Sequence, residues 1–141
     1  MSAIEWNESL QTGVDAIDEQ HHRLVEIFNE LDAALQVGRA HKQMRTILDE
    51  LVEYTQSHFD DEEKLMEEMG YPELAGHRIE HRQLLDKVGR FQKKLDLGQE
   101  RISRPVMQFL NYWLTKHILQ SDMEIGVFAN AGQETESETP A

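Results

Sequence analysis

Five of the chain's seven histidines fall on the apolar stripes of segments with helical periodicity. They are His21, His58, His77, His81 and His117, and Glu62 lies four residues after His58. Burying an imidazole costs free energy unless a neighbouring group uses its lone pair or compensates its charge. Neutral imidazole nitrogens and carboxylate oxygens are natural ligands of metal ions. The shared placement therefore predicts a metal site inside the protein.

These histidines belong to four segments in which apolar residues recur at alternating spacings of three and four, with glycines between the segments. The first expected helix lies near 16–37 with Asp15 as its N-cap, the second runs through Met44 to Met69, the third through Leu74 to Leu95, and the fourth follows Ser103 and passes His117. Short connections at 38–40, 70–73 and 97–102 make sequential helices antiparallel. The pattern predicts an all-α fold, an up-down-up-down antiparallel four-helix bundle.

The remaining segments are expected to lie outside the bundle core. Residues 1–14 form an N-terminal arm, for which Trp6 is the expected anchor. Residues 1–130 are expected to form one four-helix domain of a length that suits a single core. The last residues, 131–141, are acidic and polar without an apolar period, which predicts a disordered C-terminal tail.

Counting residues from each turn places the histidines at one level of the bundle. His21 lies about 18 residues before the first turn and His58 about 19 after it, or about 27 Å and 28 Å along the two helix axes. The same count from the second and third turns places His77, His81 and His117 at that level. His77 and His81 are four residues apart and share a helical face. The polar residues of all four helices can therefore converge on one point.

Two carboxylates are candidates for the same level of the bundle, and their spacing from the histidines differs. Glu62 shares a face with His58 because the two are four residues apart. Asp122 lies five residues after His117, which on an ideal α-helix turns it away by about 140°. It reaches the same centre only if the helix loosens there, for instance through a π-type turn. Helix geometry alone makes Asp122 the weakest member of the set.

Three other polar residues are expected to stay outside the site. His22 is one step off its apolar stripe and should be solvated. His41 is separated from His58 by about 25 Å of helix. Thr55 is expected to donate its hydroxyl to the backbone carbonyl one turn earlier.

Five nitrogens and two carboxylates exceed the four ligands of a single structural zinc ion. A pair of six-coordinate ions, bridged by Glu62, Asp122 and one solvent-derived oxygen, uses the whole set and leaves one coordination position open. An open position on a redox-capable metal, in an apolar bundle without an acid–base pair, favours reversible capture of a small neutral ligand. Nitrogen-rich ligation suits iron, although the spacing also admits manganese, cobalt or zinc.

Composition excludes several other classes of protein. The chain has 141 residues and no cysteine, so disulfides, thiolate metal sites and iron–sulfur clusters are excluded. A formal net charge of −13 argues against nucleic acid as a partner. No signal-like N-terminus and no apolar run of about 20 residues is present, so we expect a cytoplasmic protein without membrane insertion. Polar outer faces favour a monomer.

Four motifs together resemble the hemerythrin family, and more narrowly its single-domain bacterial members: DEQH at 18–21, HFDDEE at 58–63, HRIEH at 77–81 and HILQSD at 117–122. The resemblance covers the chain from about Trp6 to Asn130. It implies two iron ions with an oxo or hydroxo bridge that bind dioxygen reversibly. On this resemblance, His77, His81 and His117 hold the coordinatively filled iron, His21 and His58 hold the iron that receives dioxygen, and Glu62 and Asp122 bridge the two irons.

The resemblance makes the exclusion of water and proton donors the protein's own task. The expected ligand pocket is apolar and consists of residues beside the ligands, namely Leu24, Trp113, Leu114 and Ile118. The predicted function is oxygen storage, transport or delivery, with an oxygen-consuming protein as a recipient, and not catalysis. The alternatives are a di-iron enzyme acting on nitric oxide or peroxide and an oxygen or redox sensor. Against them, the chain lacks the paired Glu-x-x-His motifs of the ferritin-like enzymes, its nearest analogue being Asp18-x-x-His21, and we expect no second domain to carry a signal.

Overall fold

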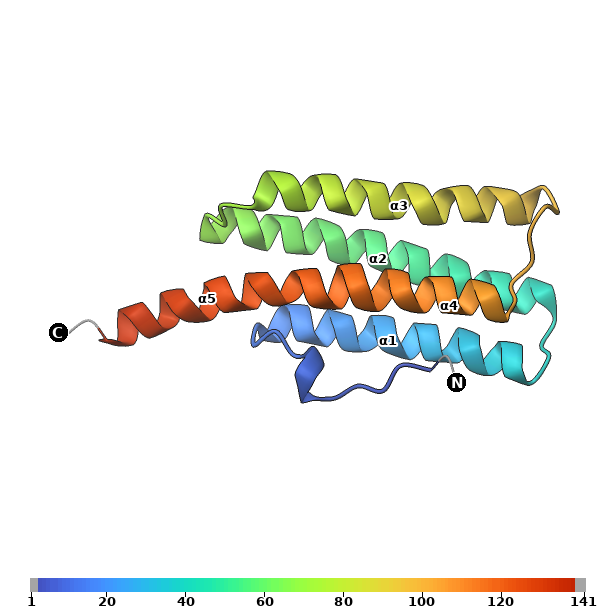
Figure 1. The fold of residues 1–141 in the computed structure, drawn as a ribbon, viewed down its shortest axis with the longest axis horizontal. Coiled ribbons are helices and arrows are strands. Elements are labelled where there is room, and N and C mark those ends of the chain that lie inside the picture. Colours follow the sequence, from blue (N-terminus) through green and yellow to red (C-terminus); the bar gives the residue numbers. More distant parts are fainter. Residues whose placement is uncertain (1–2, 139–141) are drawn as a thin grey trace.

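The computed structural model describes residues 3–138, apart from the side chains of residues 117, 120 and 132–138. Every regular element in this range is a helix. In chain order they are a short 3₁₀ turn η1 (Glu8–Leu10), α1 (Asp15–Gln36), α2 (His41–Met69), α3 (Leu74–Asp96), α4 (Arg104–Tyr112), the π-helical segment η2 (Trp113–Gln120) and α5 (Ser121–Glu138). In Figure 1, α4, η2 and α5 run on as one long helix whose C-terminal end projects beyond the other three.

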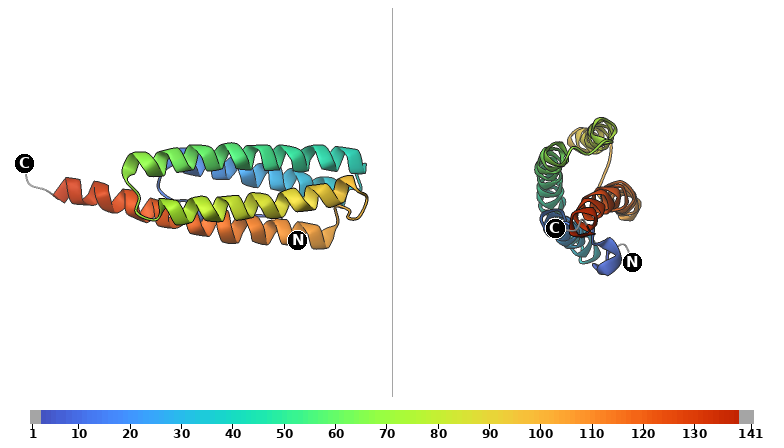
Figure 2. Two further views of the ribbon diagram at one scale, coloured as in Figure 1. Left: turned by 90° about the horizontal axis from the view of Figure 1, so that it is seen from above. Right: turned by 90° about the vertical axis from the view of Figure 1, so that its left-hand side faces the viewer.

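The four long helices close into a ring around one core. Helix α1 contacts α2, α2 contacts α3, α3 contacts η2, and α4 contacts α1. The end-on view in Figure 2 shows these rods around a common centre. The connections are short, and each of the first three helices is followed by a glycine with positive φ at positions 38, 70 and 98. The predicted antiparallel four-helix bundle is confirmed.

The start of α1 differs by one residue from the expectation. Asp15 is the first helical residue, and Val14 occupies the N-cap position without a side-chain hydrogen bond. The carboxylate of Asp18 reaches back instead. It accepts hydrogen bonds from the backbone N–H groups of Thr12 at 2.6 Å and Gly13 at 3.1 Å. The N-cap prediction for Asp15 is wrong, because a carboxylate one turn into the helix binds the arm that precedes it.

The core consists of two apolar clusters of unequal size. The larger one joins buried side chains of all four long helices, among them Leu24, Phe28, Leu48 and Leu110, each 0% exposed. Each such side chain stabilises the fold by about 1.5–3 kcal/mol relative to an exposed position. The smaller cluster consists of Ile17, Met66, Tyr71 and Ile125. A layer of buried polar residues lies between the two clusters along the helices.

The N-terminal arm is held chiefly by Ile4. Its backbone N–H donates to Asn29 Oδ1 at 2.8 Å, and its carbonyl accepts from Asn29 Nδ2 at 2.8 Å. Ile4 is buried, whereas Trp6 is partly buried against the core with its ring edge-on to His22. Both residues anchor the arm, and Ile4 is the deeper of the two.

The C-terminal end of the chain is helical further than expected. Helix α5 continues through Glu138, past the boundary expected at residue 130. Residues 131–138 are therefore helical where a disordered tail was expected, residues 139–141 lie outside the described residues, and the domain boundary stays a prediction. Among the described residues no helix is both long and apolar enough to cross a membrane.

Candidate metal centre

The fold brings six of the seven predicted metal-site residues into one buried cluster. Helix α1 supplies one of them, α2 two, α3 two and α5 one: His21, His58, Glu62, His77, His81 and Asp122. None of these six residues is more than 7% exposed. The seventh, His117, lies in η2, and its side chain is outside the described part of the structure.

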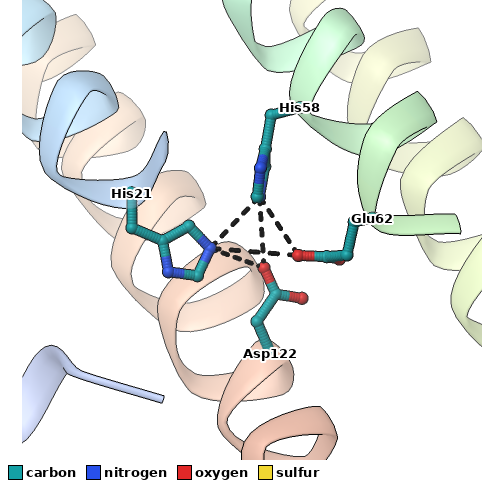
Figure 3. Close-up of side chains that lie close together, drawn as sticks. All are labelled: His21, His58, Glu62 and Asp122. Atoms are coloured by element: carbon teal, nitrogen blue, oxygen red, sulfur yellow. Dashed lines mark hydrogen bonds and ion pairs between the residues drawn. The ribbon is translucent and has the colours of Figure 1, made fainter. Parts of the chain in front are cut away.

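The six residues form two groups that share both carboxylates. The first contains His21 and His58 with Glu62 and Asp122, and Figure 3 shows these four side chains pointing toward one another. The second contains His77 and His81 with the same two carboxylates. Within each group, the candidate ligand atoms all lie within 4.8 Å of one another. We call these the first and second histidine groups.

Asp122 divides its two oxygens between the groups. Its Oδ2 lies 2.8 Å from His21 Nε2 and 3.4 Å from His58 Nε2. Its Oδ1 lies 2.8 Å from His77 Nε2. One carboxylate therefore faces two separate sets of imidazole nitrogens.

Glu62 has the same arrangement. Its Oε2 lies 3.1 Å from His58 Nε2, whereas its Oε1 lies 3.2 Å from His77 Nε2 and 3.1 Å from His81 Nε2. Two carboxylates that each direct one oxygen to either side have the orientation of bridges between two cations. The arrangement is suited to two ions rather than one.

The π-helical segment brings Asp122 to the centre. Residues 113–120 form η2, and α5 begins one residue before Asp122. A π-helix closes its hydrogen bonds between residues five apart, so positions 117 and 122 come much nearer to one face than in an α-helix. This is the loosening that the spacing of His117 and Asp122 required, and that expectation is confirmed.

Two polar residues outside the predicted set orient the histidines. Gln20 Oε1 accepts a hydrogen bond from His58 Nδ1 at 2.6 Å, and Glu63 Oε2 accepts one from His81 Nδ1 at 3.0 Å. A proton held on Nδ1 leaves the Nε2 lone pair directed at the centre. Sequence reasoning missed both residues, although each lies next to a predicted ligand in the chain. Their only signal was that position.

The donor set fits a metal because several of its atoms have no other partner. Within the described residues, four buried atoms lack a hydrogen bond: His21 Nδ1, both carboxylate oxygens of Glu62 and His81 Nε2. An unsatisfied buried polar atom costs about 1–3 kcal/mol. Three of the four belong to the facing ends of the two groups, where a cation would bind them.

The two carboxylates raise the pKa of neighbouring histidines. Burial alone would lower the pKa of His58, but the neighbouring carboxylates of Asp122 and Glu62 outweigh burial and raise that pKa to about 9. Burial would also lower the pKa of His77, but the same two carboxylates raise it to about 10. Burial would raise the pKa of Glu62, yet the surrounding histidines hold it well below its usual range. A metal ion entering this site must therefore displace protons.

The cluster is enclosed by apolar side chains. Ile17 and Leu24 lie one turn before and one turn after His21, in the smaller and the larger core cluster respectively. The four residues of the expected ligand pocket, Leu24, Trp113, Leu114 and Ile118, are all at most 1% exposed and belong to the larger cluster. Their burial suits an apolar wall, while their role in a ligand pocket stays a prediction.

The polar residues expected to stay outside the site do so. His22 and His41 are exposed, and His22 Nδ1 lies 3.1 Å from a carboxylate oxygen of Glu26. Thr55 donates its hydroxyl to the carbonyl of Leu51 at 2.7 Å. These three predictions are confirmed.

Comparison with known proteins agrees with this geometry. Residues 12–128 match the family model described as the hemerythrin HHE cation binding domain. Bacteriohemerythrin from Stenotrophomonas maltophilia is 37% identical over 122 residues, covering 86% of this chain and 78% of the relative. Bacteriohemerythrin from Clostridium acetobutylicum is 34% identical over 124 residues, covering 84% of this chain and 95% of the relative.

The fold comparison gives the same result. A crystal structure of wild-type hemerythrin superimposes with a TM-score of 0.80 at 29% identity, covering 87% of this chain and 95% of that one. The sequence, the fold and the buried histidine–carboxylate cluster therefore support the same family assignment. The chain belongs to the hemerythrin family.

Proposed function

We propose that this protein binds dioxygen reversibly at a pair of iron ions, for storage, transport or delivery of oxygen. The observation that carries the proposal is the division of each carboxylate, since Glu62 and Asp122 both direct one oxygen to each histidine group. Membership of the hemerythrin family supports iron as the metal.

In this proposal each histidine group holds one ion. His21 and His58 hold the first, and His77 and His81 hold the second together with His117, which the resemblance adds. Glu62 and Asp122 would each offer one oxygen to either ion. When bound, the iron pair supplies the electrons that hold dioxygen.

The chain's other residues protect the site. Apolar clusters on both sides of the polar layer keep water and proton donors away. We assign the ligand pocket to four buried apolar residues, Leu24, Trp113, Leu114 and Ile118. A site whose surroundings are apolar serves binding better than acid–base catalysis, so we propose a carrier rather than an enzyme.

An anaerobic iron titration followed by oxygen tests the proposal. We expect two irons per chain and a visible absorption band that appears with oxygen, disappears on its removal and returns over repeated cycles. Protein loaded with zinc serves as a control and should show no band. Binding of a single iron, or irreversible consumption of oxygen, would contradict the proposal, and the latter would favour an enzyme.

The role of the apolar wall can be tested at Leu24. The substitution Leu24→Ser places a hydroxyl one turn from His21 and should quicken autoxidation, because it admits water and a proton donor. Leu48→Ser is the matched control, since Leu48 is equally buried but about 15 Å along α2 from His58. An autoxidation rate that is the same in both variants would remove Leu24 from this role.

A further inference from the structure

The two histidine groups differ in the contacts behind their ligands. In the first group, His58 Nδ1 donates to the neutral amide oxygen of Gln20 at 2.6 Å. In the second, His81 Nδ1 donates to the carboxylate of Glu63 at 3.0 Å. A carboxylate behind an imidazole raises its basicity as a ligand more than an amide does, because it stabilises positive charge on the ring.

The remaining histidine of the first group has no contact of this kind behind its ring. His21 Nδ1 is buried and has no hydrogen-bond partner among the described residues. Nothing behind this imidazole therefore strengthens it as a ligand or fixes its ring. The first group has one neutral contact where the second has a charged one.

The residue behind His58 also lines a surface pocket, although His21 and His58 themselves are buried. A pocket of about 330 Å³ lies between α1 and α2, and its lining includes Gln20, Asp61 and Glu62. The Gln20 amide spans from His58 to Asp61, since its Nε2 donates to Asp61 Oδ2 at 2.9 Å. Its side chain thus stands between the pocket and His58. Ala16 and Glu68 contribute to the outer part of the lining.

We propose that the ion held by His21 and His58 enters and leaves through this pocket, with Gln20 as the positioning residue that closes it, and that it leaves before the ion held by His77 and His81. The inference rests on the proposed function only in requiring two metal ions. Groups that hydrogen-bond to a ligating histidine typically change metal affinity by about 10–100-fold. The charged contact of Glu63 therefore favours retention of the second ion by a factor in this range.

The test is the release of cobalt(II) from fully loaded protein into excess EDTA, followed by the cobalt absorption spectrum. We expect two phases of equal amplitude in the unaltered chain. The double substitution Gln20→Glu with Asp61→Asn moves the negative charge to the contact with His58 while keeping net charge and side-chain size. It should slow the fast phase about tenfold or more and leave the slow phase unchanged.

The reciprocal variant addresses the other group. Glu63→Gln should quicken the slow phase and bring the two rates together. Arg78→Gln is its control, because Arg78 contacts Glu63 from the exposed side at 3.2 Å and does not touch His81. It should leave both phases unchanged, whereas a change as large as that of Glu63→Gln would assign the effect to surface charge and overturn the inference.

The route is tested separately from affinity. Ala16→Phe fills the mouth of the pocket and should slow the fast phase of release without altering the two bound ions at equilibrium. Ala75→Phe, at an exposed position of α3, is the matched control and should change neither phase.

The outcomes separate the two proposals. Release of two ions in a single phase, or a fast phase that the Gln20 double variant and Ala16→Phe leave unchanged, would overturn the inference alone. Binding of fewer than two cobalt ions would contradict the proposed site itself. Two-phase release without reversible oxygen binding of the iron form would contradict only the proposed function.

Discussion

The first three long helices and the fourth bring polar residues to the same centre by different geometry. Helices α2 and α3 each present a pair of residues four apart, as an ordinary α-helix does. The fourth helix changes to a π-helix over residues 113–120, and Asp122 follows at once. The comparison shows that the fourth helix departs from α-helical hydrogen bonding directly before Asp122, the residue that contacts both histidine groups.

The largest effect is expected from removing the residue that the π-helical segment positions. Asp122→Ala removes an oxygen from both histidine groups, so we expect neither ion to be retained after desalting. Metal analysis per chain measures this. Glu124→Ala, an exposed carboxylate of the same helix, is the control and should retain the full metal content. Retention of two ions by Asp122→Ala would mean that the fourth helix is not needed for the site.

Glycine substitutions compare the packing of the same two regions. A Cβ at Gly126 would lie 2.0 Å from the backbone oxygen of Thr12, so Gly126→Ala must displace the arm and should destabilise the protein by about 1–3 kcal/mol. At Gly89, in α3, a Cβ meets nothing within 4 Å. Gly89→Ala should therefore stabilise by about 0.5–1 kcal/mol. Urea unfolding measures both, and equal effects would refute the close contact of α5 with the arm.

The pH dependence of the metal-free protein tests the histidines of the regular helices. The pKa of His58 is raised to about 9 and that of His77 to about 10, from an ordinary value of 6.5. Their ion pairs stabilise the fold fully below about pH 6.5 and are lost as the pH rises through 9 and 10. Glu62 stays ionised throughout this range because its pKa is lowered.

We therefore expect the free energy of unfolding of the metal-free chain to fall between pH 7 and pH 10, as measured by urea denaturation. The variant His58→Gln with His77→Gln should show a flatter profile. Stability that rises over this range would contradict the assigned charges.

The smallest effect is expected at Thr55, a polar residue on the regular part of α2. Thr55→Val removes the hydrogen bond from the Thr55 hydroxyl to the carbonyl of Leu51. That carbonyl keeps the backbone hydrogen bond of the α-helix. The free energy of unfolding should change by less than about 1 kcal/mol, and the metal content should not change. A loss of metal in this variant would show that the site depends on Thr55 as well.

Most of the bundle could be predicted because it depends on local periodicity. The apolar stripes placed most helix ends within three residues, the end of α5 excepted, and axial counting placed His21, His58, His77 and His81 at one level. Contacts between side chains far apart in the chain could not be obtained in this way. Gln20 meets His58 across 38 residues, and the arm meets α5 at Gly126, because rotamers and helix packing decide these contacts.

The chain by itself determined the order and direction of the long helices and the inward placement of His21, His58, Glu62, His77 and His81. These follow from residue spacing, since an apolar stripe can be buried in only one way on a helix of fixed pitch. Only the tertiary structure decided how Glu62 and Asp122 divide their oxygens, which residues support His58 and His81, and where the fourth helix becomes a π-helix. The reason is that each depends on distances of a few ångströms between separate helices, which no local repeat encodes.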